Sequence, residues 1–486
     1  MNFCGALKKN EEILKKNICG DDIKYLRFTV SGHNAVAVYT DSICDKELLG
    51  REVVRPLSEY AGEYSLEGIQ LVSLIAVPAS GNSVNKAVEQ ILDGSAVILC
   101  DGIKGFFSAD LKKFEVRAVA EPPLQTVTRG PREGFNECIK TNLSLLRRRI
   151  KSPNLEVINL SVGRLSKTAV AVVYINSVAE KTLADSIIKK IKEIDIDNAA
   201  DSSYIAKLIS THKGSIFKTV NYSEKPDVVT ARLAEGRIAI IVDGSPIVLT
   251  VPYLLIEDFQ NPEDYYGNTV HSNFVRWIRI CSLAFSVLLP AFYVASQLFH
   301  LQFIPLNFLL TIVNSIKGIP MSPSFEMFFI LLIFEILNEA SIRMPKYAGM
   351  ALSIVGALVL GDTAVRAGIV SSPAILIMAL SAISLYTVPD LVETMSIIRI
   401  SMLIVAGSVG GYGIILGIIF LINYLCATEN FGTPILAPFA PLVPEDLKDT
   451  FYLSYLSEMQ RRPRSIKNHN PVRMRFKNSK DNTDKP

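Results

Sequence analysis

The sequence predicts a chain of two parts: a soluble α/β region of two tandem mixed-sheet subdomains, followed by an all-α multi-span membrane bundle. Residues 280–299 form a run of twenty without a formal charge, and no comparable run precedes it. An α-helix of that length crosses roughly 30 Å of hydrocarbon. Before this run, two short apolar patterns each occur twice in the same order. The mean hydropathy of +0.30 therefore averages a charged front region with an apolar rear one.

The N-terminal residues indicate the compartment of the front region. Residues 1–20 are polar and rich in lysine, without the apolar core and small-residue cleavage site of a secretory signal. The seven cysteines are spaced singly, with neither CxxC nor zinc-site spacing. We therefore expect a cytosolic front region with reduced cysteines and no metal.

The front region contains an internal repeat. NAVAVYTDS at residues 34–42 returns as TAVAVVYINS at 168–177, and GSAVILCDG at 94–102 returns as GRIAIIVDG at 236–244. Amphipathic helices are expected before the second pattern of each unit, near 82–93 and near 225–235. The Asp-Gly pair after each buried strand predicts a type I′ hairpin turn, in which both central residues have positive φ. Tandem α/β units are the favoured interpretation, and the alternative is chance similarity between short apolar runs.

The expected boundary between the subdomains is the Glu-Pro-Pro segment at 121–123. Proline removes backbone donors and biases the residue before it away from helix. The first subdomain then spans residues 1–125 and the second spans 126–270. Residues 129–153 have apolar residues at helical spacing and a proline suited to a first turn, so they predict a connecting helix.

Three consecutive arginines, Arg147, Arg148 and Arg149, lie near the end of that helix. They point in three directions, whereas phosphate recognition needs a clustered basic face. We expect a solvated or ion-paired helix terminus and no nucleic-acid partner. The front region has no Walker loop, no GxGxxG after a strand, no HExxH and no nucleophile elbow. The chain is not expected to be an enzyme, and no cofactor is predicted.

The rear region is predicted to be a transmembrane helical domain at residues 271–430, followed by a basic cytosolic tail at 431–486. The stretch at 301–316 is short and bounded by prolines, which favours an interfacial or re-entrant segment. Longer apolar stretches follow at 324–345, 347–369, 373–391 and 400–428. About five segments are strongly apolar on this reading.

The charges that flank the apolar segments place both ends of this domain in the cytosol. Arg276 and Arg279 precede the first span, and the tail from Arg461 holds nine Lys/Arg against two Asp. If both ends of the domain lie in the cytosol, the chain must cross the membrane an even number of times. This conflicts with a count of five apolar segments. Either one apolar segment is re-entrant or the stretch at 301–316 crosses the membrane.

The most unusual feature is a set of polar residues on one face of an apolar helix. Glu335, Asn338, Glu339 and Arg343 share this face, and Glu326 lies on another. A carboxylate that faces lipid costs at least about 2.5 kcal/mol, so the face is expected to contact protein, water or a pore. Two interpretations stay open: pairing within the bundle that fixes helix register, and an ion path lined by Glu335 and Glu339.

Two further patterns concern contacts between helices. Asp362 and Arg366, four residues apart, are a candidate intramembrane ion pair. Four glycines have the small-xxx-small spacing that lets helices approach closely in lipid: Gly407 with Gly411, and Gly413 with Gly417. They predict self-association of the chain, which a pore built from few helices requires.

Six motifs in order along nearly the whole chain resemble the A subunit of bacterial spore germinant receptors, the GerA family. These motifs are RGPREGF at 129–135, LLRRRIKSP at 145–153, FEILNEASIRMP at 334–345, SIVGALVLGDTAVRAGIVS at 353–371, FGTPILAPFAP at 431–441 and RRPRSI at 461–466. The resemblance implies a non-catalytic receptor subunit in the inner membrane of a dormant spore. It also implies a transporter-like B subunit and a lipoprotein C subunit as partners, and an A subunit that oligomerises into an ion channel.

Two residues depart from the pattern of that family. Asn338 stands where the family usually has arginine, and Asp362 where it usually has glutamine. If these two residues line a pore, the substitutions change the charge of the pore. If they pack against other helices, the substitutions reflect a change in packing. Two other functions remain as alternatives. A self-contained secondary transporter would show internal repeats in the membrane region, and a membrane-anchored sensor would bind its ligand in the front region.

Overall fold

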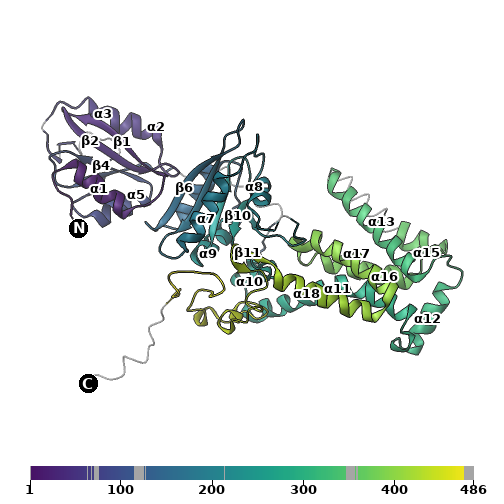
Figure 1. Ribbon diagram of the computed structural model, residues 1–486. Helices are drawn as coiled ribbons and strands as arrows, with labels where there is room; N and C mark the ends of the chain where they lie inside the picture. The colour runs from purple at the N-terminus through teal and green to yellow at the C-terminus, as the bar shows by residue number, and fades with distance from the viewer. Residues whose placement is uncertain are drawn as a thin grey trace, which may run out of the picture. The chain divides into compact units, whose positions relative to one another are not determined.

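The structure is a computed structural model that describes residues 2–62, 64–66, 68–69, 76–113, 125, 127–212, 214–345, 356 and 359–474. The chain divides into two compact units (Figure 1). The first unit contains Met1–Tyr253, Asn430–Thr433 and the tail from Tyr455; the second contains Leu254–Glu429 and Pro434–Ser454. The predicted boundary at residues 121–123 lies outside the described residues.

The first subdomain is a five-stranded sheet with the strand order β1-β2-β4-β5-β3. Its elements are α1 (Leu7–Asn17), β1 (Ile23–Val30), β2 (His33–Thr40), α2 (Lys46–Leu48), η1 (Leu49–Val54), α3 (Arg55–Ser58), β3 (Ala76–Gly81), α5 (Val84–Leu92), β4 (Ser95–Cys100) and β5 (Phe106–Asp110). Each paired strand runs antiparallel to its neighbours.

The second subdomain repeats this arrangement in the order β6-β7-β9-β10-β8. Its elements are α6 (Ile139–Arg149), β6 (Leu155–Val162), β7 (Thr168–Ile175), α7 (Lys181–Lys192), α8 (Ser202–Ile209), β8 (Asn221–Ser223), α9 (Pro226–Ala234), β9 (Ile238–Val242) and β10 (Val248–Val251). The predicted tandem repeat is therefore confirmed, together with the helices near 82–93 and 225–235.

The prediction of mixed sheets was wrong, because both sheets are antiparallel in all their described pairs. Short turns join β1 to β2 and β4 to β5, and strands joined in this way run in opposite directions. The third strand of each subdomain pairs at the far edge of the sheet. Helix α5 or α9 then returns the chain to the middle, where the next strand enters antiparallel to β2 or β7.

Both sheets are covered by helices on both faces. On β2, Val36 and Val38 pack in a core with residues of α1 and α5, while Ala35 and Ala37 pack in the opposite core with Leu57 of α3. Successive strand residues point to opposite faces. A strand that is buried on both faces therefore has a continuous apolar sequence, which is the pattern seen in the repeated motifs.

The two Asp-Gly segments form hairpins, but the type I′ prediction was wrong. The loops span residues 101–105 and 243–247, and only the glycines have positive φ, +82° at Gly102 and +84° at Gly244. The aspartates have a second role. Asp101 accepts a hydrogen bond from the backbone N–H of Leu7 at 3.0 Å, and Asp243 accepts one from Ile139 at 3.1 Å. Each therefore stabilises the first turn of a helix, α1 or α6.

The predicted connecting helix is shorter than expected and covers the second sheet. Helix α6 begins at Ile139, because the Asn142 side chain bonds both the backbone N–H and the carbonyl of Asn136 and holds the preceding segment outside the helix. The apolar face of α6 packs against residues of the second sheet. Its last two residues, both arginines, pair with Glu133, as expected for an ion-paired terminus.

A buried ion pair joins the two subdomains. Arg147 of α6 donates from Nε and Nη2 to the two carboxylate oxygens of Asp22, each at 2.7 Å. The Arg147 side chain is 0% exposed and that of Asp22 is 3% exposed. Beside this pair, the backbone N–H of Asp21 donates to the carbonyl of Val157 at 2.8 Å.

The second unit is helical. Its elements are η2 (Leu255–Phe259), α10 (Glu263–Tyr266), α11 (Thr269–Leu298), η3 (Leu301–Phe303), α12 (Leu306–Ile316), α13 (Pro323–Arg343), η4 (Val359–Thr363), α15 (Ala364–Arg366), α16 (Ser372–Leu385), η5 (Pro389–Leu391), α17 (Val392–Val409), α18 (Gly411–Ala427) and η6 (Pro444–Lys448). About half of the predicted span near 347–369 lies outside the described residues.

Among the described residues, two helices are long and apolar enough to cross a membrane, Thr269–Leu298 and Pro389–Val409. Shorter apolar helices occur at Leu306–Ile316, Ser372–Leu385 and Gly411–Ala427. The uncharged stretch at 400–428 is two helices and not one. The helix is interrupted at Gly410, whose φ of +69° falls in the left-handed region that glycine tolerates.

The segment after α18 is divided between the two units. Residues Asn430–Thr433 and the tail from Tyr455 belong to the first unit, and Pro434–Ser454 to the second. The tail is fixed to the second subdomain: Arg462 Nε donates to the carbonyl of Ala234 at 2.5 Å, and His469 N donates to Val178 O at 2.9 Å. The tail therefore contributes to the fold of the first unit up to the last described residue.

Candidate functional site

A buried arginine connects four of the apolar helices. Arg399 of α17 is 3% exposed, and its Nη2 donates to Glu335 Oε1 of α13 at 2.6 Å. Its Nη1 donates to Ser381 Oγ of α16 at 3.2 Å. Ser381 Oγ in turn donates to the carbonyl of Ser286 in α11 at 2.5 Å. We call Glu335, Arg399, Ser381 and Ser286 the arginine network.

A proline accounts for the place where the network meets α11. Pro290 lies inside that helix and has no backbone N–H, so the carbonyl of Ser286, four residues earlier, lacks its usual helical donor. Ser381 supplies the missing hydrogen bond. In an apolar bundle, a carbonyl released by proline is commonly satisfied by a serine of a neighbouring helix. The network therefore compensates for a local break in α11 as well as for a buried charge.

The polar face predicted on α13 divides into an inner and an outer part. Glu335 pairs with Arg399, and Asn338 Oδ1 accepts a hydrogen bond from the Tyr386 hydroxyl at 2.5 Å. Glu339 and Arg343 instead pair with each other at 2.5 Å, with side chains 60% and 78% exposed. The structure thus brings Glu335 together with a residue of α17 and leaves the Glu339 pair on the surface of this chain.

Glu326 occupies a separate buried position. Its side chain is 1% exposed, and its Oε1 accepts the backbone N–H of Ser371, the N-cap residue of α16. The carboxylate lies where the helix dipole of α16 favours a negative charge. The structure places Glu326 apart from the Glu335 face, as the sequence predicted. It also shows that Glu326 caps the N-terminus of α16 inside the helical unit.

The remaining sequence candidates also contact residues of the same chain. Asp362 and Arg366 form the expected pair at 2.6 Å, with exposed side chains. Gly407 and Gly411 are on different helices, because the chain breaks at Gly410. A Cβ on each glycine would approach a neighbouring side chain: 2.7 Å from Ser324 Oγ for Gly407, 3.4 Å from His300 Cε1 for Gly411, 2.7 Å from Val405 Cγ1 for Gly413 and 2.6 Å from Met402 Sδ for Gly417. Self-association through these glycines stays a prediction.

Arg399 is the main residue that sequence reasoning missed. It is the one charged residue in the stretch from Met395 to Val409, and an arginine in such a stretch is costly unless a carboxylate or another polar group meets it. That cost was the signal available in the sequence. Its partner is 64 residues away, so no local spacing joins the two.

A second charged cluster lies where α11 begins. Asp264 of α10 accepts hydrogen bonds from Arg276 Nε at 3.0 Å and from Arg279 Nη1 and Nη2 at 2.8 Å. Arg276 also donates to Asp449 at 2.8 Å. Burial alone would raise the pKa of Asp264, but the hydrogen bonds and charge of Arg279 and the charge of Arg276 outweigh it and hold that pKa below its ordinary value.

This cluster predicts a pH-dependent stability. Because the folded-state pKa of Asp264 is lowered, its stabilising effect is present above the unfolded value of about 3.9 and is lost as the pH falls through the folded value. Asp264→Asn is expected to lower the thermal unfolding midpoint of the full chain in detergent at pH 7. The difference from the wild type should narrow below about pH 4. A difference that stays constant between pH 7 and pH 3 would contradict this assignment.

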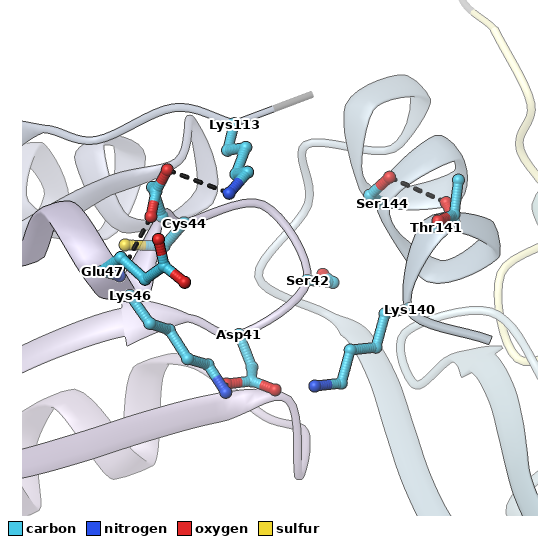
Figure 2. A pocket seen from close by; sticks show the side chains of 10 residues that line it. Asp41, Ser42, Cys44, Lys46, Glu47, Lys113, Lys140, Thr141 and Ser144 are labelled. Carbon is cyan, nitrogen blue, oxygen red and sulfur yellow. Dashed lines mark hydrogen bonds and ion pairs between the residues drawn. The ribbon is translucent and has the colours of Figure 1, made fainter. Parts of the chain in front are cut away.

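The first unit contains a polar cavity of about 220 Å³ between its two subdomains. Figure 2 shows Lys46 beside Asp41 on one side of the cavity, with Lys140 of α6 extending toward Asp41 from the other. The Lys113–Asp45 pair measures 3.1 Å. Charges of both signs line the cavity, so it suits a small molecule with both acceptor and donor groups.

Together the fold and these sites define a class of protein: a duplicated α/β unit on the same chain as an apolar helical unit with an internal ion pair. Residues 9–465 match the family model described as Bacillus/Clostridium GerA spore germination protein. The chain belongs to this family of spore germination proteins.

Relatives cover nearly the whole chain. Spore germination protein KA of Bacillus subtilis (strain 168) is 34% identical in an alignment over 478 residues that covers 96% of this chain and 88% of that protein. Spore germination protein GerQA of Bacillus cereus is 33% identical, over 98% of this chain and 95% of its own. The membrane protein YfkQ of Bacillus subtilis (strain 168) is 35% identical, over 94% of this chain and 90% of its own.

A solved structure also matches part of the chain. It is the N-terminal domain of the A subunit of the Bacillus megaterium spore germinant receptor GerK3, with 27% sequence identity and a TM-score of 0.42. The match covers 52% of this chain and 98% of that one.

Proposed function

We propose that the protein is the A subunit of a nutrient germinant receptor in the spore inner membrane, where it transduces germinant binding into ion release. Membership of the family supports this role, as do two helices long enough to span a bilayer. The helical unit crosses the membrane several times and the front unit lies in the cytosol. The subunit works with a transporter-like B subunit and a lipoprotein C subunit, forms an oligomer and catalyses no reaction.

The observation that carries this proposal is the Arg399–Glu335 pair at 2.6 Å inside an apolar helical unit. A buried charge pair is a poor way to gain stability, because desolvation opposes the attraction between the charges. It suits an element that changes between two arrangements. In this structure Arg399 neutralises Glu335, and Glu339, which pairs with Arg343, is 60% exposed. Separation of α13 from α17 frees the Glu335 charge, and the two carboxylates then line one path for cations.

The test is germination of spores that carry Glu335→Gln or Glu339→Gln. Each variant is expected to slow nutrient-triggered cation release by about tenfold or more, since each removes a charge from the path. Cation release is measured in the medium with an ion-selective electrode after nutrient addition. Receptor amounts are compared by immunoblot of spore membranes.

Glu393→Gln is the matched control, because Glu393 is an exposed carboxylate in the first turn of α17. It is expected to leave cation release unchanged. Wild-type release from spores in which both Glu335 and Glu339 are alanine would reject the conduction role.

The polar cavity between the subdomains favours a second candidate function, a membrane-anchored sensor that binds a small nutrient in the front unit. Lys140 and Glu47 line this cavity outside its two ion pairs and offer groups of opposite charge to a ligand. Titration calorimetry of the full chain with amino acids and sugars distinguishes the two functions. Only the sensor requires binding in the absence of other subunits.

A further inference from the structure

A second pocket of the first unit carries two lysines, and neither pairs with a carboxylate in the part of the chain that the structure describes. It has a volume of about 310 Å³ and is lined by residues along α7, by the segment after α18, by Lys467 of the tail, and by Thr211 and Pro252. The polar and aromatic residues that matter are Glu180, Thr182, Ser186, Lys190, Phe431 and Lys467. We call it the α7 pocket.

The contacts of Lys190 in this pocket are with uncharged groups. Its Nζ donates to the carbonyl of Ile209 at 3.1 Å and lies 4.5 Å from the centroid of the Phe431 ring. Neither contact carries a formal negative charge, and burial lowers the pKa of the Lys190 ammonium. Among the described residues, neither Lys190 nor Lys467 forms an ion pair. A partly desolvated cation of this kind gains most from an anion supplied from outside the chain.

The surrounding groups indicate what kind of anion fits. The pocket extends along α7, a helix of 12 residues, from the N-cap residue Glu180 to Lys190 in the last turn, so its acidic and basic groups come from opposite ends of the helix. The Glu180 carboxylate repels anions, so the anionic part of a ligand would lie beside the lysines. This carboxylate also accepts a hydrogen bond from the Thr182 hydroxyl at 2.7 Å. Glu180 and the hydroxyls of Thr182 and Ser186 suit the hydroxyl groups of the same ligand.

We propose that the α7 pocket binds a phosphate ester that carries free hydroxyls, of the glycerol phosphate type. Lys190 and Lys467 contact the phosphate oxygens, and Glu180 accepts a hydroxyl of the glycerol part. The volume of about 310 Å³ is at the small end of the range for ligand sites, which agrees with a headgroup-sized molecule.

Two sources supply this chemistry, a free phosphate ester in solution and the headgroup of a phospholipid. Only Thr428, Glu429 and Asn430 separate the end of the apolar helix α18 from Phe431 in the pocket. Four residue steps reach at most about 14 Å. If α18 enters the bilayer, a headgroup at the membrane surface is therefore within reach of the pocket.

The test uses the full chain in nanodiscs and compares the wild type with Lys190→Gln and Lys467→Gln. Native mass spectrometry counts phosphatidylglycerol molecules retained by protein from mixed phosphatidylcholine and phosphatidylglycerol nanodiscs. Titration calorimetry with sn-glycerol 3-phosphate, in pure phosphatidylcholine nanodiscs, measures the free ester. Each substitution is expected to weaken binding about tenfold, because each removes a charge-assisted hydrogen bond.

Lys192→Gln is the matched control, because Lys192 is an exposed lysine of the same helix outside the pocket. It should bind as the wild type does. Retention of phosphatidylglycerol without binding of the free ester identifies a lipid site, and binding of both identifies a site for phosphate esters in general. Equal binding by the wild type, the Lys467→Gln protein and the control overturns the proposal, as does no binding of either probe. Lys467 is exposed, so its substitution keeps the test valid if Lys190→Gln does not fold.

Discussion

Arg399→Leu is expected to destabilise the helical unit by about 3 kcal/mol, because it leaves the Glu335 carboxylate among apolar helices without its partner. Removal of one member of a buried pair costs about 3–5 kcal/mol, and the 28% exposure of Glu335 favours the lower end. The thermal unfolding midpoint of the full chain in detergent measures the change. Arg399→Lys retains the charge but replaces the two guanidinium nitrogens that meet Glu335 and Ser381 with a single ammonium, so an intermediate loss is expected.

The double variant Glu335→Leu/Arg399→Met separates stability from function. Apolar replacement of both partners removes the desolvation cost of both charges, so the unfolding midpoint should return to near the wild-type value. If the pair also controls ion release, spores with the double variant contain normal receptor amounts but do not germinate normally. Wild-type germination by the double variant would reduce the pair to a structural contact. A double-mutant cycle without coupling would show that the pair does not form in solution.

Asp22→Ala is expected to destabilise the first unit by about 3–5 kcal/mol, since it leaves Arg147 fully buried without a carboxylate. Arg147 makes both of its short contacts to Asp22, and its Nη1 is already buried without a partner. The loss is measured as the shift in thermal unfolding of the full chain. Faster cleavage by a protease between the subdomains is expected as well, because the pair is part of the contact that joins them.

The adjacent arginine provides the control for this measurement. Arg148 pairs with Glu133, and the two side chains are 28% and 35% exposed. Solvent reduces the value of such a pair, so Arg148→Ala should cost less than about 1 kcal/mol. Similar losses for Asp22→Ala and Arg148→Ala would contradict the importance assigned to burial. Partial recovery in Asp22→Leu/Arg147→Met would support it.

The parts of the fold that could be predicted are those that local sequence patterns determine. The repeat was visible because each strand that is buried on both faces requires an uninterrupted apolar run, and both copies kept it. The strand direction was not visible, because an apolar run reads the same in a parallel and in an antiparallel sheet. The late start of the helix at Ile139 depends on the contact of the Asn142 side chain with Asn136, and this contact has no signature in apolar spacing.

For a related reason, only one partner of the Arg399–Glu335 pair could be predicted from the sequence. The cost of a carboxylate in an apolar helix identified Glu335 and Glu339 from the sequence, but the partner of Glu335 depends on how two helices pack. The break at Gly410 was equally invisible, because glycines are common in apolar helices and nothing local marks the one that adopts positive φ. The two cavities combine segments far apart in the chain, and no spacing rule brings them together.

The attachment of the C-terminal segment limits how membrane orientation can be probed. The sequence predicted a basic cytosolic tail, and in the structure Arg462 and His469 of this tail bond to the backbone of the second subdomain. A truncation that starts near Tyr455 would remove the contacts of Arg462 and His469 with the second subdomain and the Lys467 side chain of the α7 pocket. Reporter proteins for topology mapping should therefore be fused beyond Met474, where they extend the chain without removing these contacts.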